Sequence, residues 1–288
     1  GGGLNQSSER GGKVDNSRGH IRLAQWAQLL VQIWLIEILE AGTRICQVPP
    51  YVRLKGSEMS IRATHSYADR SDLAGDLAWV IANQLLAAVE ETGQARIAVR
   101  GGITPKLLFG VLGDIDLPWE AINITFVDDR CVPTDHDQSN VALVQEFLMN
   151  GMAANANLYP LFNAELGQSA SAAAATEQFA PADILLLGMG EDAHTASLFP
   201  GSQQLAAGLG DLEPAIIATD ATAPPLLPRL TMNKSAIDAA GLRILHIEGQ
   251  AKREVFEAAK QPNTDPMLSP ISAFLNDPHA DIEVYWAP

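Results

Sequence analysis

From residue 60 onward, short apolar runs alternate with segments whose apolar residues recur at the spacing of a helix. The strongest run, residues 184–187, is continuously apolar and ends at Gly188, which is typical of a strand buried on both faces. Strands that alternate with helices favour βαβ units, whose strands pair in parallel. We therefore predict an α/β fold in which one mostly parallel sheet is flanked by helices, within a single domain.

Each apolar run and each periodic segment gives one expected element. Strands are predicted at residues 96–100, 122–127, 184–187, 215–219, 242–247 and 282–286. Helices are predicted at residues 71–91, from Pro105 onward, at 140–149, beginning within 163–176, at 251–260 and at 271–275. Residues 128–140 are dense in acids and other polar groups, and we expect a loop there.

Residues 1–57 differ in composition from the rest of the chain. Their apolar stretch at 26–39 is interrupted by polar residues, is not followed by a cleavage site, and is too short to span a membrane. Two interpretations remain open: a non-native extension before a functional start near Met59, or an amphipathic helix that packs on the domain. In either case, we expect the functional domain to occupy residues 58–288.

Charge and cysteine content limit the partners and the compartment. The 288-residue chain has a net charge of −15 and a pI near 4.7, which argues against a general nucleic-acid binder. An anionic small substrate remains compatible with this charge, since a few cations can outweigh the global field at one site. The two cysteines, Cys46 and Cys131, lack metal-ligand spacing and are too few for a disulfide framework, so we expect a reducing, cytoplasmic compartment.

The turn after Gly188 carries the strongest candidate for catalysis. Glycines let the chain turn at the carboxyl end of a strand, where open α/β sheets bind ligands. His194 follows Asp192 there, and an imidazole beside an acid is a candidate general base. The alternative is a histidine that caps a helix or fills the core. The turn also fits a dinucleotide fingerprint formally, but Glu191 and Asp192 beside a pyrophosphate argue against that function.

Residues 100–105, RGGITP, join a predicted strand to a predicted helix. The N–H groups of Gly101 and Gly102 and the Thr104 hydroxyl could bind phosphate at that helix start. The alternative is an ordinary turn with a helix cap.

Four further charged residues are candidates for a binding role. Asp128 directly follows a strand and is placed to face a ligand, whereas Arg130 could clamp an anion or pair with neighbouring acids. Arg229 lies among apolar residues and prolines, and could anchor an anion or form a structural ion pair. Lys252, at a predicted helix start, could add to an anion site or be an ordinary solvated lysine. Residues 135–137, DHD, lack a distinctive metal spacing, so we expect a solvated loop and no metal site.

Together these segments resemble the 6-phosphogluconolactonase family, whose relatives include glucosamine-6-phosphate isomerase/deaminases. The resemblance spans roughly residues 68–286 and rests on RGGITPKLLF, ITFVDDRCVPTDHDQSN, DILLLGMGEDAHTASLFPGS, PRLTMN and residues 249–252, in that order. It implies a Rossmann-like parallel sheet, no cofactor, and hydrolysis of 6-phospho-D-glucono-1,5-lactone in the oxidative pentose phosphate pathway. We expect a sugar phosphate as partner, no nucleic acid or membrane, and a monomer or small homo-oligomer.

The resemblance also implies a role for each candidate residue. His194 would activate water for attack on the lactone carbonyl, and Asp192 would orient its imidazole. Asp128 and Arg130 would contact sugar hydroxyls or support the site, and Gly190 would line the substrate site. The 6-phosphate would be held by Gly101, Gly102, Thr104, Arg229 and Lys252.

Four positions depart from the family's usual pattern. Arg100 stands where Ser or Asn is common, and Ile103 stands where Ser is common, which removes one possible phosphate ligand. Asp129 replaces a usual Glu after Asp128. Ala193 replaces a common Gly, and its methyl group should be tolerated unless its φ is positive. These departures bear on how phosphate is held more than on the chemistry.

Two other functions are compatible with parts of the pattern. An amino-sugar-phosphate isomerase/deaminase would carry an acid shortly after the histidine, where this chain has Leu198 and Phe199. A non-catalytic sugar-phosphate-binding module would keep the phosphate residues but would not need both Asp192 and His194. Both considerations favour the lactonase.

Overall fold

A seven-stranded parallel sheet forms the centre of the described part of the chain. The computed structural model describes residues 61–210, 214–222, 224–279 and 281–288. Across the sheet, the strand order is β1-β10-β9-β6-β2-β3-β5, and all the pairs are parallel. The strands are β1 (Ile61–Ser66), β2 (Ala95–Val99), β3 (Ile122–Phe126), β5 (Asn157–Leu158), β6 (Ile184–Leu187), β9 (Leu242–Glu248) and β10 (Ile282–Ala287).

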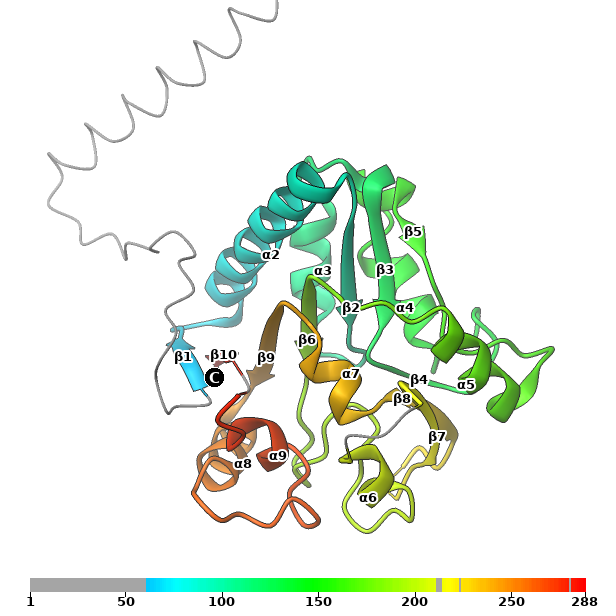
Figure 1. Ribbon diagram of the computed structural model, residues 1–288. Helices are drawn as coiled ribbons and strands as arrows, with labels where there is room; N and C mark the ends of the chain where they lie inside the picture. Colours follow the sequence, from blue (N-terminus) through cyan, green and yellow to red (C-terminus); the bar gives the residue numbers. More distant parts are fainter. Residues whose placement is uncertain (1–60, 211–213, 223, 280) are drawn as a thin grey trace, which may run out of the picture. The chain divides into compact units, whose positions relative to one another are not determined.

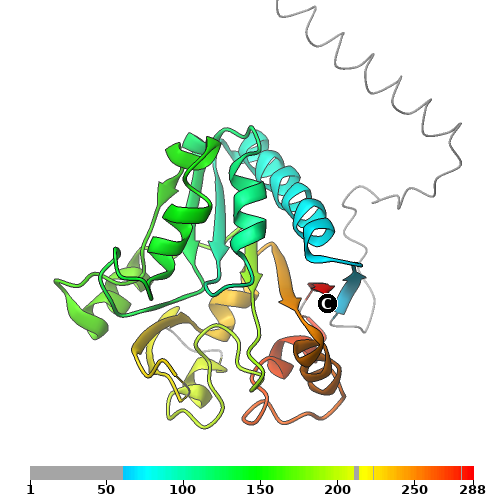
Figure 2. The same ribbon diagram turned by 180° about the vertical axis from the view of Figure 1, so that it is seen from behind.

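Helices cover both faces of this sheet, which is why β3 and β6 are buried along their whole length. Figures 1 and 2 show α2, α3 and α4 on one face and α5 and α7 toward the other, with α8 and α9 beyond the ends of β9 and β10. The helices are α2 (Arg70–Thr92), α3 (Lys106–Gly113), α4 (Asn140–Phe147), α5 (Gly167–Glu177), α6 (Leu205–Gly208), α7 (Lys234–Asp238), α8 (Gln250–Ala259) and α9 (Ser272–Leu275), with 3₁₀ turns η1 (Trp119–Ala121) and η2 (Met152–Asn155).

α2 is a core helix, although its length and composition would also suit a membrane span. Its side chains at Leu73, Leu77, Ile81 and Leu85 are fully buried. Their spacing of four residues keeps them on one side of the helix, which packs on the strands and on α3. The apolar character of α2 is therefore explained by burial inside the domain.

The strand order reverses at β2 and β6. From β2 the chain moves to β3 and β5 on one side, then crosses back to β6 on the other side and continues to β9 and β10. Such a reversal leaves a crevice at the carboxyl ends of the two strands, where open α/β sheets bind ligands. The loops that carry Gly101 and His194 begin at this crevice.

A second, antiparallel sheet lies at the lower right of Figure 1. Our prediction of a loop throughout residues 128–140 is wrong at its start, because residues 128–130 pair with another strand. Three polar residues show no apolar alternation, so periodicity does not reveal such a strand. The pairing places Arg130 directly opposite Arg229. The sheet has the order β4-β8-β7, with β4 (Asp128–Arg130), β7 (Ile216–Asp220) and β8 (Pro228–Met232).

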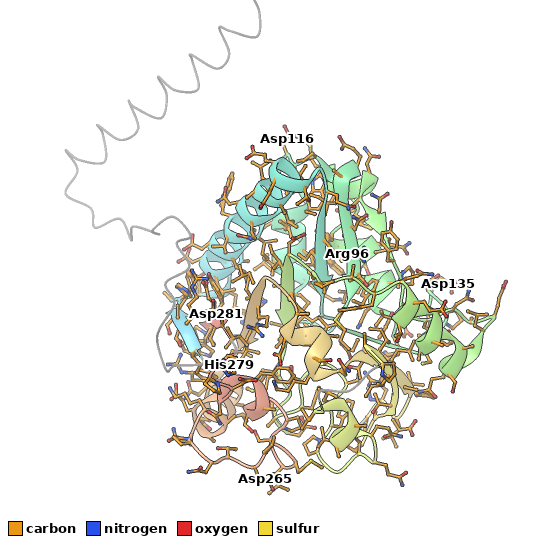
Figure 3. All side chains as sticks on the ribbon, in the orientation of Figure 1. Arg96, Asp116, Asp135, Asp265, His279 and Asp281 are labelled. Atoms are coloured by element: carbon orange, nitrogen blue, oxygen red, sulfur yellow. The ribbon has the colours of Figure 1, made fainter. Side chains whose placement is uncertain are left out.

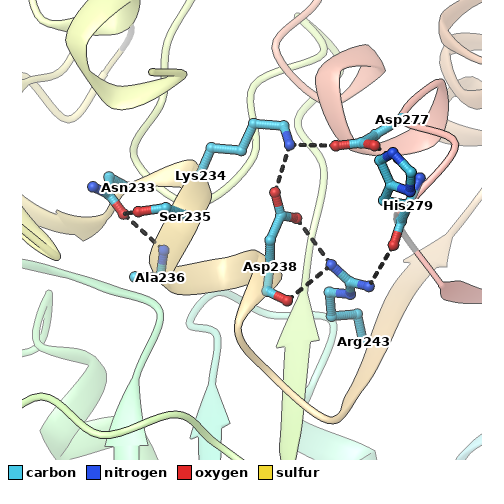
Figure 4. A network of polar contacts seen from close by, with 8 residues as sticks. All are labelled: Asn233, Lys234, Ser235, Ala236, Asp238, Arg243, Asp277 and His279. Carbon is cyan, nitrogen blue, oxygen red and sulfur yellow. Dashed lines mark hydrogen bonds and ion pairs between the residues drawn. The ribbon is translucent and has the colours of Figure 1, made fainter. Parts of the chain in front are cut away.

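A network of charged groups ties the segment after β8 to the segment before β10 (Figure 4). The Lys234 ammonium lies 2.5 Å from the carboxylates of both Asp238 and Asp277. The Arg243 guanidinium donates to the Asp238 carboxylate at 2.9 Å and to the His279 carbonyl at 3.4 Å. Because each of the four charges meets an opposite charge, the network can be partly buried without leaving an unpaired ion.

The predicted α/β architecture is confirmed. The strands and helices expected from periodicity are present, with ends within two residues of the predicted ones. β1, β5, β8 and the short helices α6 and α7 were not expected: β1 is an edge strand with alternating exposure, β5 has only two residues, and α6 and α7 have four and five. The predictions for residues 1–57 concern a segment outside the described residues.

Candidate active site

Segments from both sheets meet at the carboxyl end of the parallel sheet and enclose a cavity of about 200 Å³. In Figure 3, Asp116, which precedes β3, lies at the top, and Asp265, which follows α8, lies at the bottom. The view therefore places the carboxyl ends of the strands below. The cavity is lined by Arg100, Gly101, Gly102, Asp128, Arg130, Asn140, Gly188, Met189, Gly190, His194, Ala196, Arg229 and Lys252.

His194 lies in the turn after β6 and lines the cavity. Its Nδ1 is 2.5 Å from Oδ1 of Asp192, and the same oxygen accepts the His194 backbone N–H at 3.2 Å. Burial raises the pKa of Asp192, but the hydrogen bonds and the charge of His194 outweigh burial and lower that pKa below its ordinary value. The carboxylate is therefore ionised at neutral pH and accepts the Nδ1 proton, which leaves Nε2 as the basic nitrogen.

Close backbone packing in the turn holds this pair. The Gly190 N–H donates to the His194 carbonyl at 2.9 Å. A Cβ at Gly190 would overlap both His194 Nδ1 and Asp192 Oδ1, so the pair needs glycine at this position. Ala193 has a φ of +64°, the condition under which its methyl group is strained. The Ile271 N–H donates to the Ala193 carbonyl at 3.1 Å and ties this strained residue to the start of α9.

Gly101 and Gly102 line the cavity directly after β2. Gly102 has a φ of +94°, a conformation that glycine adopts without steric cost. A Cβ at Gly101 would overlap the side-chain amide of Asn140, so glycine lets that amide pack against the loop. Thr104 stands just before α3, as expected, but is not among the residues that line the cavity.

Arg130 and Arg229 reach the cavity from the neighbouring strands β4 and β8. Arg130 Nη1 donates to the Gln138 carbonyl at 3.0 Å and to Asn140 Oδ1 at 2.8 Å, and Arg229 Nη2 donates to the Pro225 carbonyl at 3.1 Å. Within the described residues, neither guanidinium has a carboxylate ion pair, and both Nε atoms are buried without a hydrogen-bond partner. Burial lowers the pKa of Arg229, as expected for a cation that lacks a matching anion.

Lys252 adds a cation from the first turn of α8. It has no hydrogen bond or ion pair to other described residues. Burial lowers the pKa of Lys252, and the positive charge of Arg100 lowers it further, against the carboxylates of Glu191 and Glu248. Two cations that repel each other on one cavity wall favour the binding of an anion between them.

Asp128 presents an acceptor to the cavity, and the adjacent Asp129 holds the surrounding chain. The Ser197 hydroxyl donates to Asp128 Oδ2 at 2.6 Å. Asp129 Oδ1 accepts the backbone N–H groups of Arg130 at 2.7 Å and of Asn140 at 2.8 Å. Burial raises the pKa of Asp129 to about 6, although these hydrogen bonds oppose the increase. Asp129 therefore ties β4 to the start of α4.

The structure brings most of the predicted site residues to one cavity, and Asp192 joins them through His194. Sequence reasoning missed Asn140 and left Arg100 without a role. A polar residue at a helix start is ordinarily interpreted as part of a cap, and only the burial of Asn140, which is 1% exposed, reveals its supporting role. The predicted residues on the lining are Gly101, Gly102, Asp128, Arg130, Gly190, His194, Arg229 and Lys252.

The acidic and imidazole groups at residues 135–137 are not part of the cavity lining. His136 Nδ1 accepts the Gln138 backbone N–H at 3.0 Å. In the part of the chain that the structure describes, no three His, Cys, Asp or Glu side chains are grouped to hold a metal ion.

Known proteins resemble this chain in both sequence and fold. The family model described as glucosamine-6-phosphate isomerases/6-phosphogluconolactonase matches residues 68–286. A 6-phosphogluconolactonase of Rhizobium meliloti is 39% identical over 228 residues, which cover 78% of this chain and 98% of that protein. One of Pseudomonas putida is 35% identical over 243 residues, covering 81% and 97%. The crystal structure of a 6-phosphogluconolactonase from Shewanella baltica OS155 matches with a TM-score of 0.74 at 36% identity, covering 78% of this chain and 97% of that one.

Proposed function

Because the chain belongs to the glucosamine-6-phosphate isomerase/6-phosphogluconolactonase family, we propose that it hydrolyses 6-phospho-D-glucono-1,5-lactone to 6-phospho-D-gluconate. The observation that carries the proposal is the His194–Asp192 pair, which places a basic nitrogen at a cavity lined by cations. Hydrolysis of a phosphorylated lactone needs a base and an anion site within one substrate's length.

His194 Nε2 removes a proton from water as the water oxygen attacks C1 of the lactone. The resulting tetrahedral oxyanion collapses and breaks the bond between C1 and the ring oxygen. The imidazolium returns its proton to the ring oxygen, which leaves as the C5 hydroxyl, and the new carboxylic acid loses a proton to solvent. The Asp192 carboxylate stabilises the imidazolium while it exists. A positioned base of this kind contributes roughly 10²–10⁴-fold to the rate.

The remaining residues of the site bind the substrate and orient it for attack by water. A lactone is an activated ester, so water suffices as nucleophile, and the cationic cavity favours the negative charge that develops on the carbonyl oxygen. Asp128 and Arg130 contact sugar hydroxyls or support the site, and Gly190 lines it. Binding of the remote phosphate supplies energy for orienting the lactone. The phosphate is held by Gly101, Gly102, Thr104, Arg229 and Lys252.

One observation disfavours isomerase or deaminase activity. The positions after His194 that would need an acid hold Leu198 and Phe199, which are 1% and 3% exposed. The Phe199 ring lies 4.5 Å from the His194 ring, and the Arg229 guanidinium lies 5.6 Å from the Phe199 ring centre. Phe199 therefore packs against the base where the isomerase/deaminases would carry an acid after the histidine, and the carboxylate that contacts His194 comes from Asp192, before it.

We propose a pathway, a compartment and an assembly state for the enzyme as well. The reaction belongs to the oxidative pentose phosphate pathway, and it takes place in the cytoplasm, where a chain with two cysteines stays reduced. The enzyme acts as a monomer or small homo-oligomer and does not act on nucleic acid or at a membrane.

The test is the rate of hydrolysis of freshly generated 6-phosphogluconolactone by the full chain, after the spontaneous rate is subtracted. Acceleration that saturates with substrate is the expected result. A folded protein that leaves the rate unchanged but releases ammonia from glucosamine 6-phosphate would be an isomerase/deaminase. Saturable binding of both sugar phosphates without turnover would instead identify a binding module.

A further inference from the structure

Arg100 is a cation in the cavity to which no role has yet been given. It directly follows β2, at the point where the strand order reverses. Its guanidinium occupies the space over Gly188, where a Cβ would overlap Nε, Cζ and Nη1. The absence of a side chain at Gly188 thus allows Arg100 to cross the end of β6 and line the cavity.

Two carbonyls fix the guanidinium and leave one of its nitrogens unused. Nε donates to the Gly101 carbonyl and Nη1 donates to the His246 carbonyl, each at 3.0 Å. Nη2 has no hydrogen-bond partner among the described residues. A Cβ on Gly102 would lie 3.4 Å from Nη2, so the unused donor is beside the glycine loop. The Arg100 guanidinium is therefore held through Nε and Nη1, while Nη2 is free to donate to a ligand.

No carboxylate of the described residues forms an ion pair with this group, although the charges of Asp128 and Glu248 act on it from a distance. Asp128 is engaged by the Ser197 hydroxyl at 2.6 Å. The Glu248 carboxylate lies 3.4 Å from Arg70 and 3.2 Å from His246. Within the described residues, Arg100 has no ion pair. Burial lowers the pKa of Arg100 to about 10, so the guanidinium is still protonated at neutral pH.

We propose that Arg100 binds the substrate's phosphate together with Lys252 and so sets the preference for phosphorylated over unphosphorylated lactones. This inference rests on the proposed lactonase function. The rigid fork supplies a charge-assisted hydrogen bond from Nη2, and Lys252 supplies a second positive charge from α8. A dianionic phosphate relieves the repulsion between the two cations, whereas an uncharged hydroxymethyl group does not.

The test compares Arg100→Gln and Arg100→Lys with a matched control, Arg96→Gln. Glutamine keeps an amide N–H donor for the two carbonyls but removes the positive charge. Lysine keeps the positive charge but lacks the planar guanidinium and its several N–H donors. Arg96 lies on β2, four residues before Arg100 and outside this cavity, with its guanidinium 5.6 Å from the Tyr159 ring centre. The readouts are calorimetric binding of 6-phosphogluconate and of inorganic phosphate, and kcat/KM for 6-phosphogluconolactone and for unphosphorylated gluconolactone.

Arg100→Gln is expected to weaken binding of both phosphate probes by about 10–100-fold, the range for a lost hydrogen bond to a charged group. It should lower the preference for the phosphorylated lactone by a similar factor. Arg100→Lys should lose less, and Arg96→Gln should bind like the wild type. In the wild type, the Arg100 Nε–H resonance should shift on titration with inorganic phosphate, which tests the contact even if a variant does not fold.

Wild-type affinity for phosphate in Arg100→Gln, or an unmoved Arg100 resonance, would overturn the inference while leaving lactone hydrolysis intact. An equal loss of rate on both lactones would also overturn it, because a purely structural role predicts that result. A third outcome separates the two proposals. If the wild type hydrolyses neither lactone, and Arg100→Gln binds phosphate more weakly than the wild type, the lactonase function is wrong but the anion site is supported.

Discussion

At the scale of single residues, the orientation of the His194 imidazole depends on one neighbour. Asp192 accepts the Nδ1 proton and, with its lowered pKa, stays ionised when the imidazole is protonated. The pair fits only because Gly190 has no side chain. A base held in this way should affect the chemical step more than binding.

His194→Ala should therefore lower kcat for 6-phosphogluconolactone by about 10²–10⁴-fold, the usual contribution of a positioned base. The Kd of 6-phosphogluconate should stay unchanged, because the cations of the cavity remain. His136→Ala is the matched control, since His136 does not line the cavity. Near-wild-type turnover in His194→Ala would show that another group is the base.

The raised pKa of Asp129 predicts that the stability of the protein depends on pH. Its folded pKa, raised by burial to about 6, exceeds the ordinary value of about 3.9 for an unfolded aspartate. The folded state therefore binds the proton more tightly, so this group's stabilisation is fully present below about pH 4 and is lost as pH rises through about 6.

Asp129→Asn should remove this dependence, because the amide oxygen can still accept the N–H groups of Arg130 and Asn140. The variant should gain up to about 3 kcal/mol of unfolding free energy relative to the wild type between pH 4 and pH 7. Urea unfolding across that range measures the difference, with the exposed Asp135→Asn as control. Parallel stability curves for wild type and Asp129→Asn would contradict the assignment.

At the scale of elements, the small antiparallel sheet holds two like charges face to face. Arg130 on β4 is registered directly opposite Arg229 on β8. Like charges at such positions destabilise a sheet, and Arg229 is only 4% exposed. The two facing cations favour the binding of an anion, and they lower the stability of the fold when no anion is bound.

Arg229→Met should accordingly raise the free energy of unfolding without ligand by about 1 kcal/mol, since it removes a buried cation that has no carboxylate ion pair among the residues the structure describes. KM for 6-phosphogluconolactone should rise at the same time. Arg243→Met is the contrast, because Arg243 is also buried but lies 2.9 Å from the Asp238 carboxylate. That change should destabilise the fold. Loss of stability in both variants would refute the proposed strain between β4 and β8.

The charged network in Figure 4 joins elements that are distant in sequence. Lys234 bridges Asp238 and Asp277 with 13% of its side chain exposed, so its removal leaves two carboxylates facing each other. Lys234→Met should lower the free energy of unfolding by about 1–3 kcal/mol, less than for a fully buried pair. Lys260→Met removes an ion pair with Glu257 that is more exposed to solvent. This control should change the free energy of unfolding by less than about 1 kcal/mol. Chemical denaturation measures both, and equal effects would argue against a structural role for the network.

At the scale of the whole molecule, a net charge of −15 surrounds a cavity that gathers cations. The overall field repels anions, so anion binding must come from local groups. Inorganic phosphate should raise the melting temperature beyond the effect of sodium chloride at equal ionic strength. At 100 times its Kd, a ligand that binds only the folded state adds about 2.7 kcal/mol. Equal effects of the two salts would exclude a specific anion site.

The sequence allowed the parallel sheet to be predicted, because short, mainly apolar runs alternate with helical segments, and β6 is apolar throughout. It also identified the His194–Asp192 pair, since both residues lie in one turn. It did not reveal β4, whose partner β8 lies about a hundred residues later. The role of Arg100 depends on a contact with His246, and that of Asn140 depends on packing against Gly101. In each case the two residues are remote in sequence. Local patterns therefore predicted the elements and the base, whereas the supports of the anion site needed tertiary contacts.

Arg100 and Gly188 constrain how this chain can evolve. The backbone at Gly188 does not have a positive φ, so the backbone conformation itself does not require glycine, and the nearest obstacle to a Cβ is Arg100. With arginine in place, a methyl group at 188 would push the guanidinium away from its two carbonyls. The order of substitutions thus matters: a lineage that acquires the arginine first loses its freedom at 188, and one that acquires alanine first is barred from the arginine.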